Sequence, residues 1–174
     1  MKTKLAVISV FVLTALCVSA QTVNANYDPA YDFSKVKSFY VDIGTAWGNP
    51  TNEEHAKQAV TRELTAKGWT PAPDPSTADV HVMIHGATAT KHTIQEFYSG
   101  NAGGEDYNGM AVSSHEVSFK AGTAIIDIFD AKTKKLIFRG YGEDEVSDKP
   151  EKNRQKIDNG VAKMFKDFPP KTKG

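Results

Sequence analysis

Alternating hydrophobic and polar positions predict four β-strands in this chain. In the first, "KSFYVDI", the side chains of Phe39, Val41 and Ile43 share one face. The other three follow one another with short or loop-like links, so we expect them to pair antiparallel. The four predicted strands are 37–43, 79–97, 115–130 and 135–146.

A helical period of apolar residues predicts two helices. The first begins at Thr51, which could form a capping box with Glu54, and Gly68 would end it. The second would be capped by Asp148 and Glu151 and would end before Pro169. The stripes facing the core are Ala56, Ala59, Val60, Glu63 and Leu64 in the first, and Ile157, Val161, Met164, Phe165 and Phe168 in the second.

These elements predict one α+β domain with the order β-α-β-β-β-α. We expect a mainly antiparallel sheet of about four strands, with both helices packed on one face. The chain has 174 residues, so a single domain over 21–174 is the natural size. Glycines and polar residues near 98–113 predict a mobile loop between two strands.

The N-terminus has the pattern of a secretory signal peptide over residues 1–20. Lys2 and Lys4 precede the apolar run "LAVISVFVLTALCV", and "VSA" ends at Ala20 with small residues where signal peptidase cleaves. The run is short for a membrane span, so we expect no transmembrane span after cleavage. Leu16 before Cys17 fits lipoprotein processing poorly, and a lipid anchor on Cys17 is therefore the less favoured alternative. A periplasmic or secreted location follows.

Composition narrows the function classes. Lys plus Arg and Asp plus Glu both number 21, so no basic field favours nucleic acid. Cleavage after Ala20 would remove two lysines and the only cysteine, and would leave a formal net charge of −2. A mature chain without cysteine has no disulfide and no thiolate ligand. No cofactor-binding motif is present, so no cofactor is expected.

The best-patterned stretch is "GTAIIDIFDAKTKKLIFRG" (122–140), which predicts a hairpin around "AKTKK". In that hairpin Asp127 lies opposite Arg139, and the pair would add about 0.2–1 kcal/mol if it is exposed. Asp130 would accept hydrogen bonds from the turn. The core face would carry Ile126, Ile128, Leu136 and Phe138, and the other face Asp127, Phe129, Ile137 and Arg139.

Three segments resemble the bacterial domain-of-unknown-function family numbered 4136. They are "YDFSKVKSF" (31–39), "GTAIIDIFDAKTKKLIFRG" (122–140) and "KIDNGVAKMFKDFPP" (156–170). Phe138 stands where that family typically has Trp before Arg–Gly. The resemblance implies a secreted or lipid-anchored envelope protein with an α+β fold, and it implies no catalytic residues.

Five histidines are the candidates for metal or acid–base chemistry: His55, His81, His85, His92 and His115. His81 and His85 face one side of a strand but are about 13 Å apart, too far for one ion to join them directly. His115 on a neighbouring strand could complete a site with either one. A small hydrolase or metal-dependent enzyme using His81, His85 or His115 is therefore the alternative function.

The sheet face away from the helices is the favoured working surface. It mixes apolar, aromatic and charged side chains, as recognition surfaces do. We therefore expect a non-enzymatic binding or structural module that contacts an envelope protein, a lipid or a cell-wall component. The residues expected on this face are His81, Met83, His85, Asp127, Phe129, Ile137, Arg139 and Tyr141.

Overall fold

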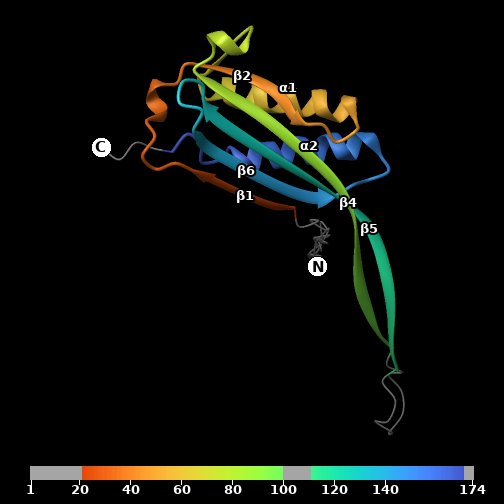
Figure 1. Cartoon of the computed structure of the whole chain (residues 1–174). Coiled ribbons are helices and arrows are strands. Elements are labelled where there is room, and N and C mark those ends of the chain that lie inside the picture. Colours follow the sequence, from red (N-terminus) through yellow and green to blue (C-terminus); the bar gives the residue numbers. More distant parts are fainter. Residues whose placement is uncertain (1–20, 100–110, 171–174) are drawn as a thin grey trace, which may run out of the picture.

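The computed structural model describes residues 21–99 and 111–170 and contains a six-stranded mixed sheet (Figure 1). The strand order is β1-β6-β5-β4-β2-β3. The expected α+β class is confirmed, whereas the expected mainly antiparallel sheet of about four strands is a mixed sheet of six, in which β2 pairs parallel with β3 and β4. The strands are β1 Thr22–Tyr27, β2 Ser38–Thr45, β3 Thr70–Pro71, β4 Val80–Ser99, β5 Ala111–Asp130 and β6 Leu136–Glu145.

Two features of the sheet were not predicted from the sequence. β1 and β3 were not expected, because β1 ("TVNANY") contains little apolar alternation and β3 has only two residues. β2 runs parallel to β4, since the helix between them carries the chain back to the starting end of the sheet. β4, β5 and β6 are antiparallel neighbours as predicted.

Helices α1 (Pro50–Ala66) and α2 (Pro150–Met164) contact one another and cover one face of the sheet (Figure 1). Close approach of α2 to β6 depends on Gly140 and Gly142, where a Cβ atom would meet the side chain of Met164. Both predicted helices are therefore present on the predicted single face. Among the described residues, no helix is long and apolar enough to cross a membrane.

The helix caps differ from the predicted capping boxes. Asn49 caps α1 by accepting a hydrogen bond from the N–H of Asn52, and Pro50 occupies the first turn. The residue before α2 is Lys149, whose side chain makes no cap bond. Each helix thus begins at a proline that the capping-box pattern did not use. The C-terminal prediction for α1 is confirmed, because Gly68 has φ +90° and the following Trp69 packs into the core.

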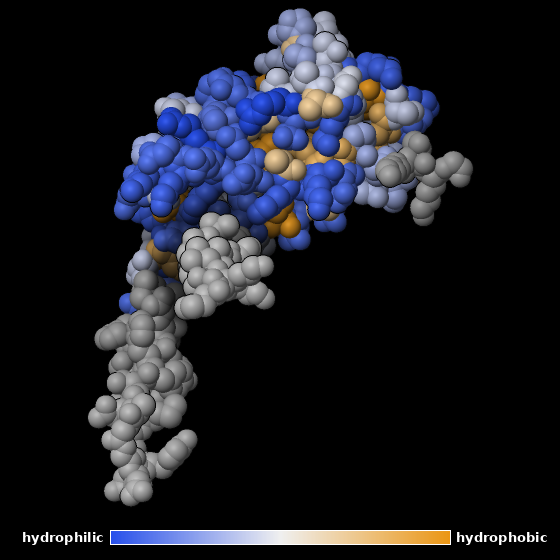
Figure 2. All heavy atoms as spheres, turned by 180° about the vertical axis from the view of Figure 1, so that it is seen from behind, coloured by the Kyte–Doolittle hydropathy of each residue, from blue (hydrophilic) through white to orange (hydrophobic). Residues whose placement is uncertain are grey.

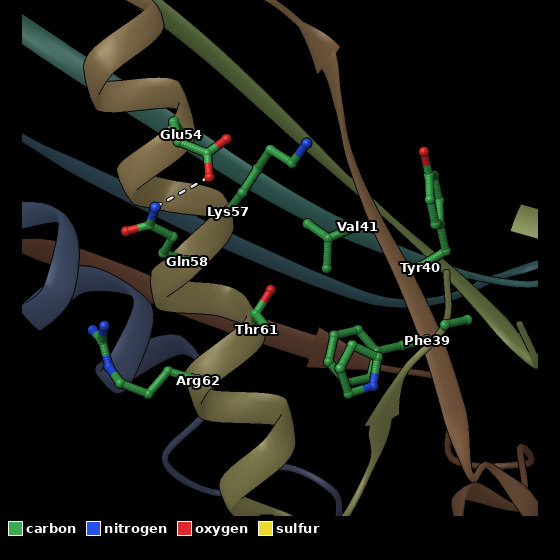
Figure 3. Close-up of a pocket in the computed structure, with 10 residues that line it drawn as sticks. Phe39, Tyr40, Val41, Glu54, Lys57, Gln58, Thr61 and Arg62 are labelled. Atoms are coloured by element: carbon green, nitrogen blue, oxygen red, sulfur yellow. Dashed lines mark hydrogen bonds between the residues drawn. The ribbon is translucent and has the colours of Figure 1, made fainter. Parts of the chain in front are cut away.

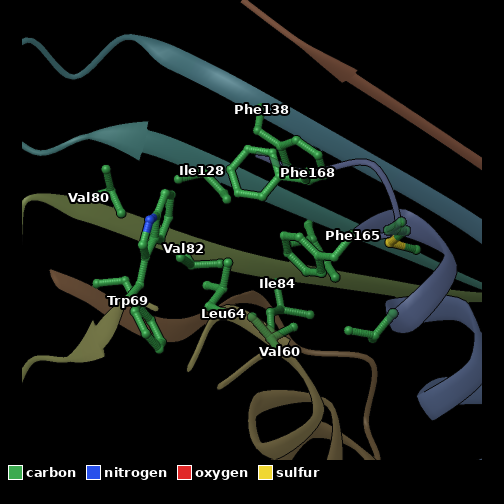
Figure 4. Close-up of a cluster of buried hydrophobic side chains, with 14 of the residues drawn as sticks. Val60, Leu64, Trp69, Val80, Val82, Ile84, Ile128, Phe138, Phe165 and Phe168 are labelled. Atoms are coloured by element: carbon green, nitrogen blue, oxygen red, sulfur yellow. The ribbon is translucent and has the colours of Figure 1, made fainter. Parts of the chain in front are cut away.

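The core lies between the sheet and the helices (Figure 4). Aliphatic side chains of β4 and β5 meet aromatic rings that follow the helices, and Phe138 stacks on Phe165 with ring centres 5.2 Å apart. Ile157 of the predicted α2 stripe is partly buried, and its other members are buried. Within the predicted α1 stripe, all but Glu63 are buried. The view from the opposite side shows a mainly hydrophilic surface with smaller hydrophobic areas (Figure 2).

β4 and β5 are each 20 residues long and extend beyond the body of the domain as a two-stranded arm (Figure 1). Their pairing is continuous from Val80 with Asp130 to Ser99 with Ala111. Strand pairing therefore includes both ends of the segment near 98–113 that was expected to be a loop. Residues 100–110 of that segment lie outside the described residues.

A β-bulge corrects the predicted facing of two β6 residues. Ile128 pairs with Phe138, but Phe129 pairs with Leu136, so Ile137 is an extra residue in β6. As a result Ile137 is 1% exposed in the core and Leu136 is 36% exposed. The predictions that Ile137 lies on the outer face and that Leu136 lies in the core are wrong.

Candidate functional site: the open face of the sheet

The face opposite α1 and α2, called the open face below, brings together seven of the eight expected residues. Strand register places them in adjacent rows, with His81 beside Phe129, and Met83 beside the Asp127–Arg139 pair. The rows also add residues that sequence reasoning missed. The open-face residues on the central strands are His81, Met83, His85, Ile125, Asp127, Phe129, Arg139 and Tyr141, with Tyr40 and Asp42 beside them on β2.

Asp127 and Arg139 form an ion pair on this face that is held by two hydrogen bonds. Arg139 Nε donates to Asp127 Oδ1 at 2.7 Å and Arg139 Nη2 donates to Asp127 Oδ2 at 2.6 Å. The Asp127 side chain is 4% exposed and that of Arg139 is 54% exposed. The bond to Asp127 raises the pKa of the Arg139 guanidinium. The predicted pairing of Asp127 with Arg139 across the hairpin is confirmed. The Asp127 carboxylate is far more buried than it would be in an exposed ion pair.

His85 lies between a hydroxyl and a carboxylate, an arrangement that resembles the nucleophile, base and orienting acid of hydrolases. Its Nδ1 is 2.9 Å from Thr45 Oγ1, and its Nε2 is 3.9 Å from Asp127 Oδ2. The second distance is too long for a hydrogen bond, and Arg139 binds both oxygens of Asp127. Asp127 therefore pairs with Arg139 and does not orient the imidazole.

The other polar groups of the face also have partners within the fold. His81 Nε2 donates to the carbonyl oxygen of Pro75 at 2.7 Å, which holds the connector before β4. Tyr141 donates to Glu143 Oε2 at 2.8 Å, and Glu143 also forms an ion pair with Lys91. The bond to Glu143 and partial burial raise the pKa of the Tyr141 hydroxyl, whereas the Lys91 and Tyr141 donors lower the pKa of Glu143.

Metal ligation has no geometric support in the part of the chain that the structure describes. No group of three His, Cys, Asp or Glu side chains there is placed to hold an ion. The side chain of His115, which was a candidate ligand, lies outside the described residues. His92 Nδ1 lies near Glu116 Oε1 at 3.1 Å, and both side chains are exposed.

Two hollows of the surface lie mainly on the helix side of the sheet, and of the open-face residues only Tyr40 lines one of them. One, of about 480 Å³, runs between α1 and the outer side of β2 (Figure 3). The other, of about 350 Å³, opens between the start of α1, α2 and the sheet, near Trp47 and Met164. The remaining open-face residues line neither of these two hollows.

The family model described as "Domain of unknown function (DUF4136)" matches residues 23–170. The chain belongs to the DUF4136 family. The resemblance seen in the three sequence segments is thus confirmed, and the match spans both helices and, except for Thr22, all six strands. No curated protein matches the sequence.

Solved structures share the DUF4136 fold at low sequence identity. A DUF4136 family protein from Bacteroides thetaiotaomicron VPI-5482 is 17% identical with a TM-score of 0.58, covering 86% of this chain and 96% of its own. A PDZ domain protein from Parabacteroides distasonis ATCC 8503 is 14% identical with a TM-score of 0.55, covering 88% of this chain and 37% of its own. The PelC dodecamer from Paraburkholderia phytofirmans is 15% identical with a TM-score of 0.51, covering 84% of this chain and 95% of its own. These likenesses show the fold.

Proposed function

We propose that the protein is a non-enzymatic binding module of the bacterial envelope and that the open face is its working surface. The signal-peptide pattern of residues 1–20 supports a periplasmic or secreted location for one domain over 21–174. The ligand is a component of that compartment: an envelope protein, a lipid or cell-wall material.

The observation that carries this proposal is that the polar side chains of the open face are held in place by the fold. His81, His85, Arg139 and Tyr141 each bond to a partner within the chain. Such groups lose little conformational freedom when a ligand binds. A catalytic base or nucleophile, by contrast, has to be available to the substrate.

Apolar groups between these fixed polar groups provide contact area. Phe129 and Tyr141 are half-buried, as are Met83 and Ile125, so a ligand could cover surface that the fold leaves partly in water. Aromatic side chains of this kind supply much of the binding energy in protein recognition.

The experiment compares wild-type protein with Phe129→Ala and Tyr141→Ala in binding to three preparations. These are purified cell-wall sacculi, vesicles of envelope lipid and solubilised envelope protein. Val146→Ala is the matched control, because Val146 is equally half-buried but lines the hollow on the helix side. Circular dichroism establishes that each variant is folded.

We expect wild type and Val146→Ala to bind one preparation alike, and the two open-face variants to bind it about tenfold more weakly. Folded Phe129→Ala and Tyr141→Ala proteins that bind as wild type does would contradict the assignment. So would wild-type protein that binds none of the three preparations.

A further inference from the structure

The two edges of the sheet differ from the faces because they expose backbone hydrogen-bonding groups. β1 forms one edge. At the other edge β3 pairs with β2 only at Ser38 and Phe39. From Tyr40 onward the outer side of β2 has no strand neighbour among the described residues.

The β1 edge lacks the features that prevent an edge strand from pairing with a strand of another molecule. Its sequence, "TVNANY", contains no charged residue and no proline, which are the usual means of preventing strand addition. Five of its six residues are exposed. Tyr27 at its end is 47% exposed, the most exposed large hydrophobic side chain among the described residues.

The β2 edge has a groove beside it that could receive such a side chain. The hollow of about 480 Å³ has Phe39 and Val41 on its strand side and Lys57 and Thr61 on its α1 side (Figure 3). Val41 and Ile43 are half-buried at this edge, so an added strand would remove apolar surface from water.

Strand direction makes the two edges compatible. β1 is antiparallel to β6, β6 to β5, and β5 to β4, while β2 is parallel to β4. β1 therefore runs opposite to β2. When two copies lie side by side with their helices on the same face, β1 of one copy meets β2 of the next in antiparallel orientation.

Each edge strand has alternate residues whose backbone N–H and C=O groups point away from the sheet, and these residues can be identified for both edges. The carbonyl of Phe39 accepts a hydrogen bond from Ala72 outside the β2–β4 ladder, so alternate residues Phe39, Val41 and Ile43 direct their backbone outward. The N–H of Asp28 bonds inward to Ile137. In β1 the outward residues are therefore Val23, Ala25 and Tyr27.

Both outward sets carry their side chains on the helix face. Phe39, Val41 and Ile43 belong to or pack against the core, as does Val23. Opposite residues of an antiparallel hydrogen-bonded pair have side chains on the same face. The two edges can thus join into one continuous sheet, with the helix layer continuing across the junction.

We propose that β1 of one copy of this chain adds to the free β2 edge of a second copy. Because β3 occupies the place beside Phe39, the joining strand sets Tyr27 opposite Val41 and Ala25 opposite Ile43. Tyr27 then enters the groove beside α1. The contact is head-to-tail, so each copy keeps one free donor edge and one free acceptor edge until a ring closes. The open face stays free, and the proposal is independent of the proposed function.

One test removes a single backbone donor from the β1 edge. Ala25→Pro keeps the β1–β6 ladder, since the outward N–H of Ala25 does not take part in it, but it blocks strand addition. Ala25→Val is the matched control with similar bulk and an intact N–H. Both proteins are expressed from the full-length sequence, and their mass is measured by size exclusion with light scattering over a range of concentrations.

We expect wild type and Ala25→Val to form assemblies larger than a dimer and Ala25→Pro to be monomeric with unchanged circular dichroism. A monomeric wild type at every concentration would overturn the proposal. A folded Ala25→Pro that assembles as wild type does would also overturn it.

A second test locates the contact by cross-linking. Cα atoms of a hydrogen-bonded antiparallel pair are about 5.5 Å apart, within the range that a disulfide spans. The double variant Ala25→Cys with Ile43→Cys should form a ladder of covalent oligomers on oxidation. The two single variants and the wild type, whose only native cysteine is Cys17 in the predicted signal peptide, should not. Covalent dimers of the single Ala25→Cys variant that exceed the wild-type amount would indicate symmetric β1–β1 pairing and would refute the proposal.

Discussion

At the residue scale, the Asp127–Arg139 pair shows how burial changes the energy of a predicted contact. The sequence correctly predicted that the two residues are opposite one another, but it could not predict that the fold removes Asp127 almost entirely from water. The Asp127 side chain is 4% exposed. A carboxylate in that position depends on its guanidinium partner, because an unpaired buried charge is costly.

We therefore expect Arg139→Ala to lower the free energy of unfolding by about 1–3 kcal/mol, more than an exposed pair would contribute. Arg139 is itself half-exposed, so water can reach the vacated place and limit the loss. Lys91→Ala is the control, since it breaks an ion pair whose partners are 45% and 26% exposed and should therefore cost less than Arg139→Ala. Urea unfolding of the two variants measures both losses, and equal losses would contradict the role given to burial.

Asp130 links stability to acid pH. The backbone N–H of Thr133 and then the Tyr31 hydroxyl, followed by further turn donors, lower its pKa from 3.8 to about 2. A carboxylate with a lowered pKa in the folded state stabilises the fold above its unfolded pKa. That contribution is lost as pH falls through the folded pKa. The window for Asp130 is therefore between pH 3.8 and about pH 2.

Urea unfolding of wild type and Asp130→Asn at pH 5 and pH 2 tests this expectation. Wild type should lose more stability between the two values than the variant, because the asparagine side chain has no proton to gain. If both proteins lose the same amount, Asp130 is not the group that titrates with unfolding.

At the element scale, glycine positions decide how closely segments approach. Gly86 of β4 lies beneath the Trp47 ring, and a Cβ atom there would overlap that ring. Trp47 belongs to the connection between β2 and α1 and packs against the core. Packing of Trp47 against the sheet therefore requires a residue without a side chain at position 86 of β4.

Gly86→Ala should displace Trp47 into water and destabilise the fold by about 1–3 kcal/mol, the cost of overpacking. Tryptophan emission should shift to longer wavelength, although Trp69, which is 5% exposed, keeps part of the signal unshifted. Ala87→Ser, at the exposed neighbouring position, is the control. Unchanged emission and stability in Gly86→Ala would show that Trp47 does not need the glycine.

At the scale of the whole molecule, the surface separates into parts with different properties. The helices close one sheet face over the core, the open face carries fixed polar groups among half-buried apolar ones, and the two edges present backbone groups. The two-stranded arm leaves the body along the strand direction rather than across the edges (Figure 1). A ligand on the open face and a second copy at an edge therefore occupy different surfaces of one domain.

The sequence alone determined the features that depend on local pattern. Helical periodicity located α1 and α2, strand alternation located β2, β4, β5 and β6, and turn chemistry set the hairpin that brings Asp127 opposite Arg139. Seven of the eight residues expected on the open face lie there because alternation along a strand needs no knowledge of distant contacts. The family resemblance rested on the same segments.

Only the tertiary structure decided the features that depend on pairing between distant segments. β1 is a strand because its backbone forms hydrogen bonds with β6. Its own residues show almost no apolar alternation, so the sequence pattern did not predict it. The bulge in β6 moved Ile137 into the core and Leu136 out of it, because one extra residue reverses the facing of its neighbours. The burial of Asp127 likewise arises from packing among strands. The sequence pattern predicts which face of its own strand a side chain lies on. It does not predict which distant segment will pack against that side chain and bury it.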